Sequence, residues 1–265
     1  MLQTAIDLQQ NAVAELVAKT AHKNEITFRA PTGSGKTRMM ADFMSRILAQ
    51  NPNIVFLVST LSKGNLAAQN YNVFAAMARN NIATIHTAST METMCTSSQQ
   101  MKPYLISTDI SGEEGLFIPL DYNVYVLPRD LYKSGGRLMQ GAMMNFLEQI
   151  TSNLFGSGQN KTIWLIKDEC HQATNNLDTL SASFFAKTIN FSATPNLRRG
   201  QNPDVEITDE DAEAAKLIKH VELGKDDETV ENAICKFEAI KENYRNLLGV
   251  NPCLIIQISN KEKAE

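Results

Sequence analysis

The sequence predicts an α/β protein in which helices cover both faces of a mainly parallel central sheet, giving three layers. From residue 3 to residue 200, short runs rich in β-branched residues alternate with longer stretches in which apolar residues recur every three to four positions. Several of these runs are apolar throughout, which is typical of strands that are buried on both faces of a parallel sheet. With 265 residues, 43% of them hydrophobic, the chain is long enough to build the core of one large domain.

The predicted strands alternate with helices along the chain. Met39 and Phe43 lie on the apolar face of a helix after the first strand, and Leu66 and Phe74 lie on the apolar face of a second helix. Residues 95–115 show no period and are expected to form an irregular insertion. The strands are expected at residues 26–30, 54–59, 83–87, 123–128, 162–169 and 188–194.

The pattern changes after Pro203. Residues 204–250 are acidic, and the apolar residues near their end recur at helical spacing, so we predict an acidic helical connector. Residues 251–265 then begin a new strand that has no sheet of its own. We therefore divide the chain into an α/β domain at 1–203, the connector, and the start of a truncated second domain. The native protein is expected to be longer than this chain.

Composition excludes several classes of protein. The formal net charge is −4, but the acidic excess lies after residue 203, so the charge does not exclude a nucleic-acid partner. The four cysteines are far apart in the sequence, which fits neither a disulfide framework nor a zinc site. The apolar runs are too short to span a bilayer, and the N-terminus lacks the pattern of a secretion signal. The sequence predicts a cytoplasmic protein with no membrane partner.

Residues 30–37, APTGSGKT, follow a predicted strand and precede a predicted amphipathic helix. Two glycines let the backbone turn so that successive N–H groups and the positive end of the helix surround an anion. Lys36 can then reach the β- and γ-phosphates of a nucleotide, and the Thr37 hydroxyl can ligate Mg²⁺. The sequence therefore predicts a phosphate loop, whose nucleotide contacts are Thr32, Gly33, Ser34, Gly35, Lys36 and Thr37.

A second group of polar residues ends the apolar run at residues 162–169, TIWLIKDE. Such a run marks a buried central strand, and ligands bind at the carboxyl ends of strands in open α/β sheets. Asp168 is expected to hold Mg²⁺ through its water shell, and Glu169 to orient and deprotonate the attacking water. With Lys36, these two carboxylates are the predicted catalytic residues. Lys167 lies where an apolar residue is more usual, and strand alternation turns it away from the face of Asp168.

Three segments together resemble a known family. APTGSGKT, DECH at residues 168–171 and SATP at residues 192–195 are similar to motifs I, II and III of superfamily 2 helicases and translocases of the DExH kind. The resemblance covers about residues 5–200. It implies a RecA-like P-loop NTPase domain that binds ATP with Mg²⁺.

The same resemblance implies roles for residues outside the phosphate loop. His171 would link the ATP site to a second domain, and Ser192 and Thr194 would couple hydrolysis to movement. Gln9 either reads the adenine edge, as a glutamine ahead of motif I does in many members, or is a polar residue on an N-terminal helix.

Two further groups are candidates for contacts with nucleic acid. Residues 59–71 look like motif Ia, in which hydroxyls and a helix N-terminus grip a phosphate, so Thr60 and Gln69 are predicted contacts. Arg129 and Arg137 belong to a basic cluster that either contacts a phosphate near the carboxyl edge of the sheet or forms a solvated face.

Within the superfamily, the insertion and the long connector look most like the motor subunits of type III restriction enzymes. Such motors use ATP to act on duplex DNA. The resemblance implies three partners: the second RecA-like domain of the same chain, duplex DNA, and a modification or specificity subunit. The family's arginine motif, Q-x-x-G-R-x-x-R, is absent from the sequence, so this chain alone is expected to hydrolyse ATP very slowly. A DExH RNA helicase and a nucleotide-gated interaction module without turnover remain as alternatives.

Overall fold

A computed structural model of the chain describes residues 3–61, 65–80, 101–106, 118–131, 142–151, 161–169, 184–198, 200–218 and 229–249, with residues 251 and 253. The chain divides into two compact units, Met1–Lys219 and His220–Glu265. The strand predicted at residues 83–87 and the strand predicted to open a second domain after residue 253 lie outside the described residues.

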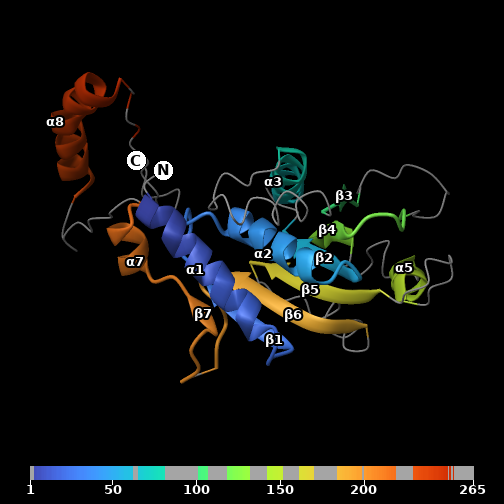
Figure 1. Ribbon diagram of the computed structural model, residues 1–265. Coiled ribbons are helices and arrows are strands. Elements are labelled where there is room, and N and C mark those ends of the chain that lie inside the picture. Colours follow the sequence, from blue (N-terminus) through green and yellow to red (C-terminus); the bar gives the residue numbers. More distant parts are fainter. Residues whose placement is uncertain are drawn as a thin grey trace, which may run out of the picture. The chain divides into compact units, whose positions relative to one another are not determined.

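The first unit is built on a sheet whose described strands run in the order β3-β4-β2-β5-β6-β1-β7 (Figure 1). Every pair of neighbours among these seven strands is parallel. Five of the strands predicted from the sequence are confirmed, with ends that differ by one to three residues. The strands are β1 (Glu25–Arg29), β2 (Ile54–Thr60), β3 (Pro103–Leu105), β4 (Val124–Pro128), β5 (Thr162–Asp168), β6 (Phe185–Ser192) and β7 (Val205–Glu206).

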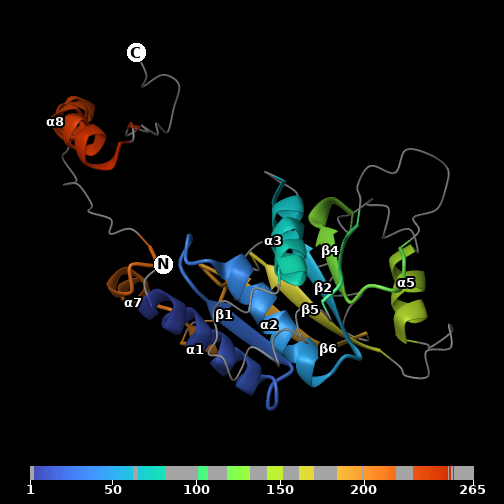
Figure 2. The same ribbon diagram turned by 45° about the horizontal axis from the view of Figure 1, so that its top comes forward.

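Alternate residues of each strand face two layers of helices. Phe56 and Val58 of β2 pack in one core with α1, α2 and α3, whereas Val55 and Leu57 pack in a second core with α5. Figure 2 shows α1, α2 and α3 along one face of the sheet. The predicted three-layer α/β architecture is therefore confirmed. The helices described in this unit are α1 (Gln3–Lys19), α2 (Lys36–Gln50), α3 (Leu66–Asn80), α5 (Ala142–Thr151) and α7 (Asp209–Ala214).

Helix α2 begins directly after the glycine-containing turn. Its predicted apolar face is confirmed, because Met39, Met40, Phe43 and Ile47 are all buried in the core against the sheet. Each such side chain stabilises the fold by about 1.5–3 kcal/mol relative to an exposed one. The buried face fixes the helix so that its N-terminus lies at the carboxyl edge of the sheet, where β1 ends.

Two short strands were not expected from the sequence. β3 falls within residues 95–115, which we predicted to be irregular, and β7 falls within residues 204–250, which we predicted to be a connector. Both lie at the two edges of the sheet and contain only three and two residues, too few to show an alternating pattern. Because β7 pairs with β1, the residues just after 203 pack with the sheet.

In the second unit, a single helix, α8 (Val230–Leu248), is described. The backbone N–H of Asn232 donates to the Thr229 hydroxyl at the start of the helix, at 3.3 Å. Gly249 ends it in the left-handed conformation, with φ of 66°. A helix in this part of the chain was expected from the spacing of its apolar residues.

Asp204 fastens the segment before β7 to the first strand. Its Oδ2 accepts a hydrogen bond from the Thr27 N–H at 2.8 Å, and its Oδ1 pairs with the Lys23 ammonium. Partial burial acts to raise the pKa of Asp204. The hydrogen bonds from Lys23 and Thr27 and the charges of Lys23 and Lys19 outweigh burial, so the pKa is lowered below its ordinary value of 3.8.

Replacement of Asp204 by asparagine is expected to lower the free energy of unfolding at pH 7 by about 0.5–1 kcal/mol, since the pair is partly screened by water. A lowered carboxyl pKa stabilises the folded state above the unfolded pKa of 3.8, and this contribution is lost as the pH falls through the folded pKa. The difference between the two proteins should therefore shrink as the pH falls below 3.8 and disappear only below the folded pKa. Urea denaturation of both proteins across this range measures it, and a difference independent of pH would contradict the prediction.

Candidate nucleotide site

The predicted phosphate loop lies between β1 and α2. Gly33 and Gly35 both have φ of 85°, a left-handed conformation that glycine adopts without a steric cost. The side-chain amide of Gln9, on α1, donates a hydrogen bond to the Ser34 carbonyl at 2.8 Å, and both residues are buried. Helix α1 thus supports the loop through this hydrogen bond. Contact of Gln9 with adenine stays a prediction, since its one described amide bond is to the loop itself.

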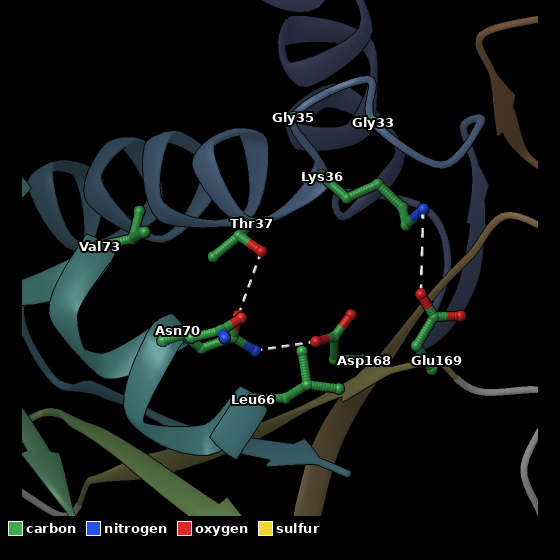
Figure 3. A pocket seen from close by; sticks show the side chains of 10 residues that line it. Gly33, Gly35, Lys36, Thr37, Leu66, Asn70, Val73, Asp168 and Glu169 are labelled. Carbon is green, nitrogen blue, oxygen red and sulfur yellow. Dashed lines mark hydrogen bonds and ion pairs between the residues drawn. The ribbon is translucent and has the colours of Figure 1, made fainter. Parts of the chain in front are cut away.

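Lys36 points into the open side of this loop. Its Nζ lies 3.3 Å from the Ala30 carbonyl oxygen and 3.3 Å from that of Pro31. It also lies 3.9 Å from Oε1 of Glu169, and the lysine side chain is only 9% exposed. Figure 3 shows Lys36 and Glu169 facing each other from the loop and from the end of β5. The ammonium group is therefore held by neutral carbonyls at a position from which it can face an anion.

The predicted magnesium ligands are joined by a residue that the sequence did not single out. The Thr37 hydroxyl donates to Oδ1 of Asn70 at 3.1 Å, and Nδ2 of Asn70 donates to Oδ2 of Asp168 at 2.8 Å (Figure 3). Asn70 is 3% exposed. A signal was present in the sequence, because Asn70 is a polar residue four positions from Leu66 and from Phe74 on the apolar face of the predicted helix.

Glu169 follows the last residue of β5 and has a φ of 57°, in the left-handed region that few residues other than glycine adopt. A backbone of this kind costs on the order of 1 kcal/mol and occurs often at functional sites. Lys167, one residue before the two carboxylates, continues the alternation of β5, in which Leu165 and Ile166 belong to opposite cores. It therefore lies on the face away from Asp168, as predicted.

These groups line one cavity of about 370 Å³. Its wall combines the phosphate loop with Gln69 and Asn70 of α3 and with Asp168 and Glu169 at the end of β5. Among the described residues, no group of three or more histidine, cysteine, aspartate or glutamate side chains could hold a metal ion. The Thr37 hydroxyl and the Asp168 carboxylate are hard oxygen donors. Mg²⁺ binds such donors when phosphate oxygens and water complete its coordination shell. The residues present therefore fit a nucleotide with magnesium.

Thr60 lies in the wall behind this cavity. It is 1% exposed, and its hydroxyl lies 3.3 Å from Oδ2 of Asp168 and 3.3 Å from Nδ2 of Asn70. Because Thr60 is the last residue of β2 and Asp168 the last of the neighbouring β5, their side chains meet at the carboxyl edge of the sheet. The structure thus places Thr60 beside the nucleotide site, and its contact with nucleic acid stays a prediction.

The segment predicted as motif III touches the phosphate loop. The Ala30 N–H donates to the Ser192 carbonyl at 3.2 Å, and Nε of Arg29 donates to the Ala193 carbonyl at 3.3 Å. The hydroxyl of Ser192 is buried and accepts a hydrogen bond from the Thr194 N–H at 3.0 Å. A displacement of this segment would therefore disturb the hydrogen bond from Ala30, the first residue of the loop.

The remaining predicted site residues do not form one group in the structure. Arg129 is partly buried and begins a short 3-10 helix, Arg129–Leu131, after β4. Thr32 is exposed in the phosphate loop. His171 and Arg137 lie outside the described residues.

Comparison with known protein families identifies the chain. Residues 4–197 match the family described as "Type III restriction enzyme, res subunit". The chain belongs to this family. The match confirms the resemblance found in the motifs, and the chain is a superfamily 2 motor domain of the Res kind. The loop, the DECH strand end and the SATP segment described above all fall within the matched residues.

A solved structure is also similar to this Res-family chain. It is a nuclease-deletion mutant of the Type ISP restriction-modification enzyme LlaGI in complex with a DNA substrate mimic. The identity is 13% and the TM-score 0.40, and the similarity covers 90% of this chain and 22% of that chain. The Res-family chain thus spans less than a quarter of the longer protein.

No protein of curated function matches the sequence. In the part of the chain that the structure describes, no helix is both long and apolar enough to cross a membrane.

Proposed function

We propose that this Res-family chain is the ATP-binding motor domain of an ATP-dependent DNA helicase or translocase that belongs to a restriction-modification-type enzyme. One observation carries the proposal: Lys36, Thr37, Asp168 and Glu169, which lie in two segments about 130 residues apart, line a single cavity at the carboxyl edge of the sheet. The family membership supports DNA as the nucleic acid.

The geometry supports a role for the phosphate loop and for four side chains of the cavity. The N–H groups of the loop and the N-terminus of α2 would hold the phosphates, and the Lys36 ammonium would offset their charge. Thr37 and Asp168 would hold Mg²⁺, which when bound neutralises charge on the β- and γ-phosphates. The Glu169 carboxylate would orient the attacking water and take its proton. Lys36 Nζ lies 3.9 Å from Oε1 of this carboxylate.

Other parts of the machinery lie beyond the nucleotide site. We propose that the second RecA-like domain follows in the same protein and supplies the missing arginine, which is worth about 10³–10⁵ in rate in related ATPases. His171 would contact that domain, and Ser192 and Thr194 would couple hydrolysis to its movement. Gln69, Thr60, Arg129 and Arg137 remain the proposed contacts with nucleic acid, and a modification or specificity subunit remains a proposed partner.

Measurement of ATPase activity in the longer protein that contains this chain tests the proposal. Turnover is expected to rise when duplex DNA is added and to vanish in the Lys36→Ala variant, because the charge that faces the phosphates is lost. Stimulation by RNA alone would instead assign the protein to the RNA helicases. Binding of ATP without turnover, with any nucleic acid, would indicate a nucleotide-gated interaction module. The isolated 265-residue chain should bind ATP and hydrolyse it very slowly.

A further inference from the structure

Asn70 connects the three elements that form the nucleotide site. It belongs to α3, and its side chain bonds to Thr37 at the start of α2 and to Asp168 at the end of β5. These partners are 33 and 98 positions away in the sequence. The amide is buried, so its bonds are shielded from competition with water. A single side chain therefore spans the two residues that would hold magnesium.

The direction of these hydrogen bonds is fixed by chemistry. An ionised carboxylate accepts hydrogen bonds only, so the group that Asn70 presents to Asp168 must be its NH₂. The amide oxygen then faces Thr37, whose hydroxyl must donate its proton to it. A hydroxyl that donates its proton in this way keeps its lone pairs for a metal ion.

The Asp168 carboxylate is oriented by the same network. The bonds that it accepts from Asn70 and from Thr60 both end on Oδ2. Among the described residues, none donates a hydrogen bond to Oδ1, so this oxygen is available for the water shell of a metal ion. Groups that hold metal ligands in place in this manner typically change metal affinity by about 10–100-fold when they are removed.

We propose that Asn70 is a positioning residue for magnesium, which holds the Thr37 hydroxyl and the Asp168 carboxylate in the orientation that binds the ion. The inference rests on the proposed function, since it assumes a nucleotide with magnesium in this cavity. The requirement for Mg²⁺ should therefore depend on Asn70, although Asn70 itself is not a ligand of the ion.

The test is nucleotide binding by the 265-residue chain, followed with a fluorescent ATP analogue while Mg²⁺ is titrated. Asn70→Leu keeps the volume of the side chain but removes its hydrogen bonds to Thr37, Asp168 and Thr60. It is expected to raise the Mg²⁺ concentration at half-maximal binding by about 10-fold or more, and to leave binding in EDTA unchanged. Thr60→Val, which removes only one donor to Asp168 and suits a strand, should raise it by a smaller factor.

Asn190→Leu is the matched control. Asn190 is also buried and also donates from its amide to a carboxylate, Oε1 of Glu25 at 3.0 Å, but away from the cavity. It should lower the unfolding temperature without changing the Mg²⁺ requirement. If Asn70→Leu matches the wild-type titration, the inference on Asn70 is wrong, whatever Thr60→Val does. A lower Mg²⁺ requirement in Asn70→Leu would also overturn it, since Asn70 would then compete with the ion. If the wild-type chain itself shows no binding that depends on Mg²⁺, the proposed function fails instead.

Discussion

Replacement of Glu169 by glutamine is expected to lower the rate of ATP hydrolysis by about 10²–10⁴-fold, the usual contribution of a general base, while ATP still binds. Glutamine has the same shape as glutamate but cannot take a proton from water. The side chain lines the cavity beside Lys36, so its loss as a base should affect turnover more than affinity. Steady-state turnover of the proposed longer protein with duplex DNA, and nucleotide binding by the 265-residue chain, measure the two quantities separately.

Glu206 offers a matched control for this substitution. Its carboxylate pairs with the guanidinium of Arg29, the residue before the phosphate loop, but it does not line the cavity. Glu206→Gln thus also removes a carboxylate that is paired with a basic side chain near the loop. It should leave both turnover and affinity close to those of the wild-type protein. Equal rates in Glu169→Gln and Glu206→Gln would show that Glu169 is not the base.

The fold could be predicted from the sequence where strands are long and buried. The strand around Phe56 and the strand that ends at Asp168 are continuous apolar runs, because helices cover both faces of the sheet there. β3 and β7 could not be predicted in this way. Each is held by its pairing with one neighbour at an edge of the sheet. A strand of two or three residues is too short for this pairing to produce a recognisable sequence pattern.

The candidate site, like the fold, could be predicted from the sequence only in part. Lys36, Thr37, Asp168 and Glu169 could be predicted because each belongs to a contiguous motif whose spacing reflects local backbone chemistry. Asn70 and the support from Gln9 to the loop could not, because both depend on contacts between elements far apart in the chain. The sequence left Gln9 either as a contact to adenine or as a polar residue of the N-terminal helix, and only the structure shows its amide bonded to the Ser34 carbonyl.

The contact between Gln9 and the loop leads to a strong effect at Gly35. A Cβ added at this glycine would lie 2.7 Å from Nε2 of Gln9, a distance at which one of the two must move. Its φ of 85° adds strain for any residue with a Cβ, on the order of 1–2 kcal/mol. Gly35→Ala is therefore expected to distort the loop and to weaken ATP binding by about tenfold or more, since 1.4 kcal/mol corresponds to a factor of ten.

Gly200 provides a control that distinguishes the effect of backbone strain from the effect of a distorted phosphate loop. Its φ of 84° is nearly the same, but an added Cβ would meet no atom of the described residues within 4 Å. Gly200→Ala should thus lower the free energy of unfolding by about 1 kcal/mol and leave ATP binding unchanged. Gln9→Ala removes the side chain that an added Cβ at Gly35 would meet, so Gly35→Ala should weaken ATP binding by a smaller factor in the Gln9→Ala background than in the wild-type chain. Isothermal titration of ATP into Gly35→Ala, Gly200→Ala, Gln9→Ala and the double variant measures these effects. If Gly35→Ala binds ATP as Gly200→Ala does, the loop does not depend on this close approach, and the phosphate cradle must be held in some other way.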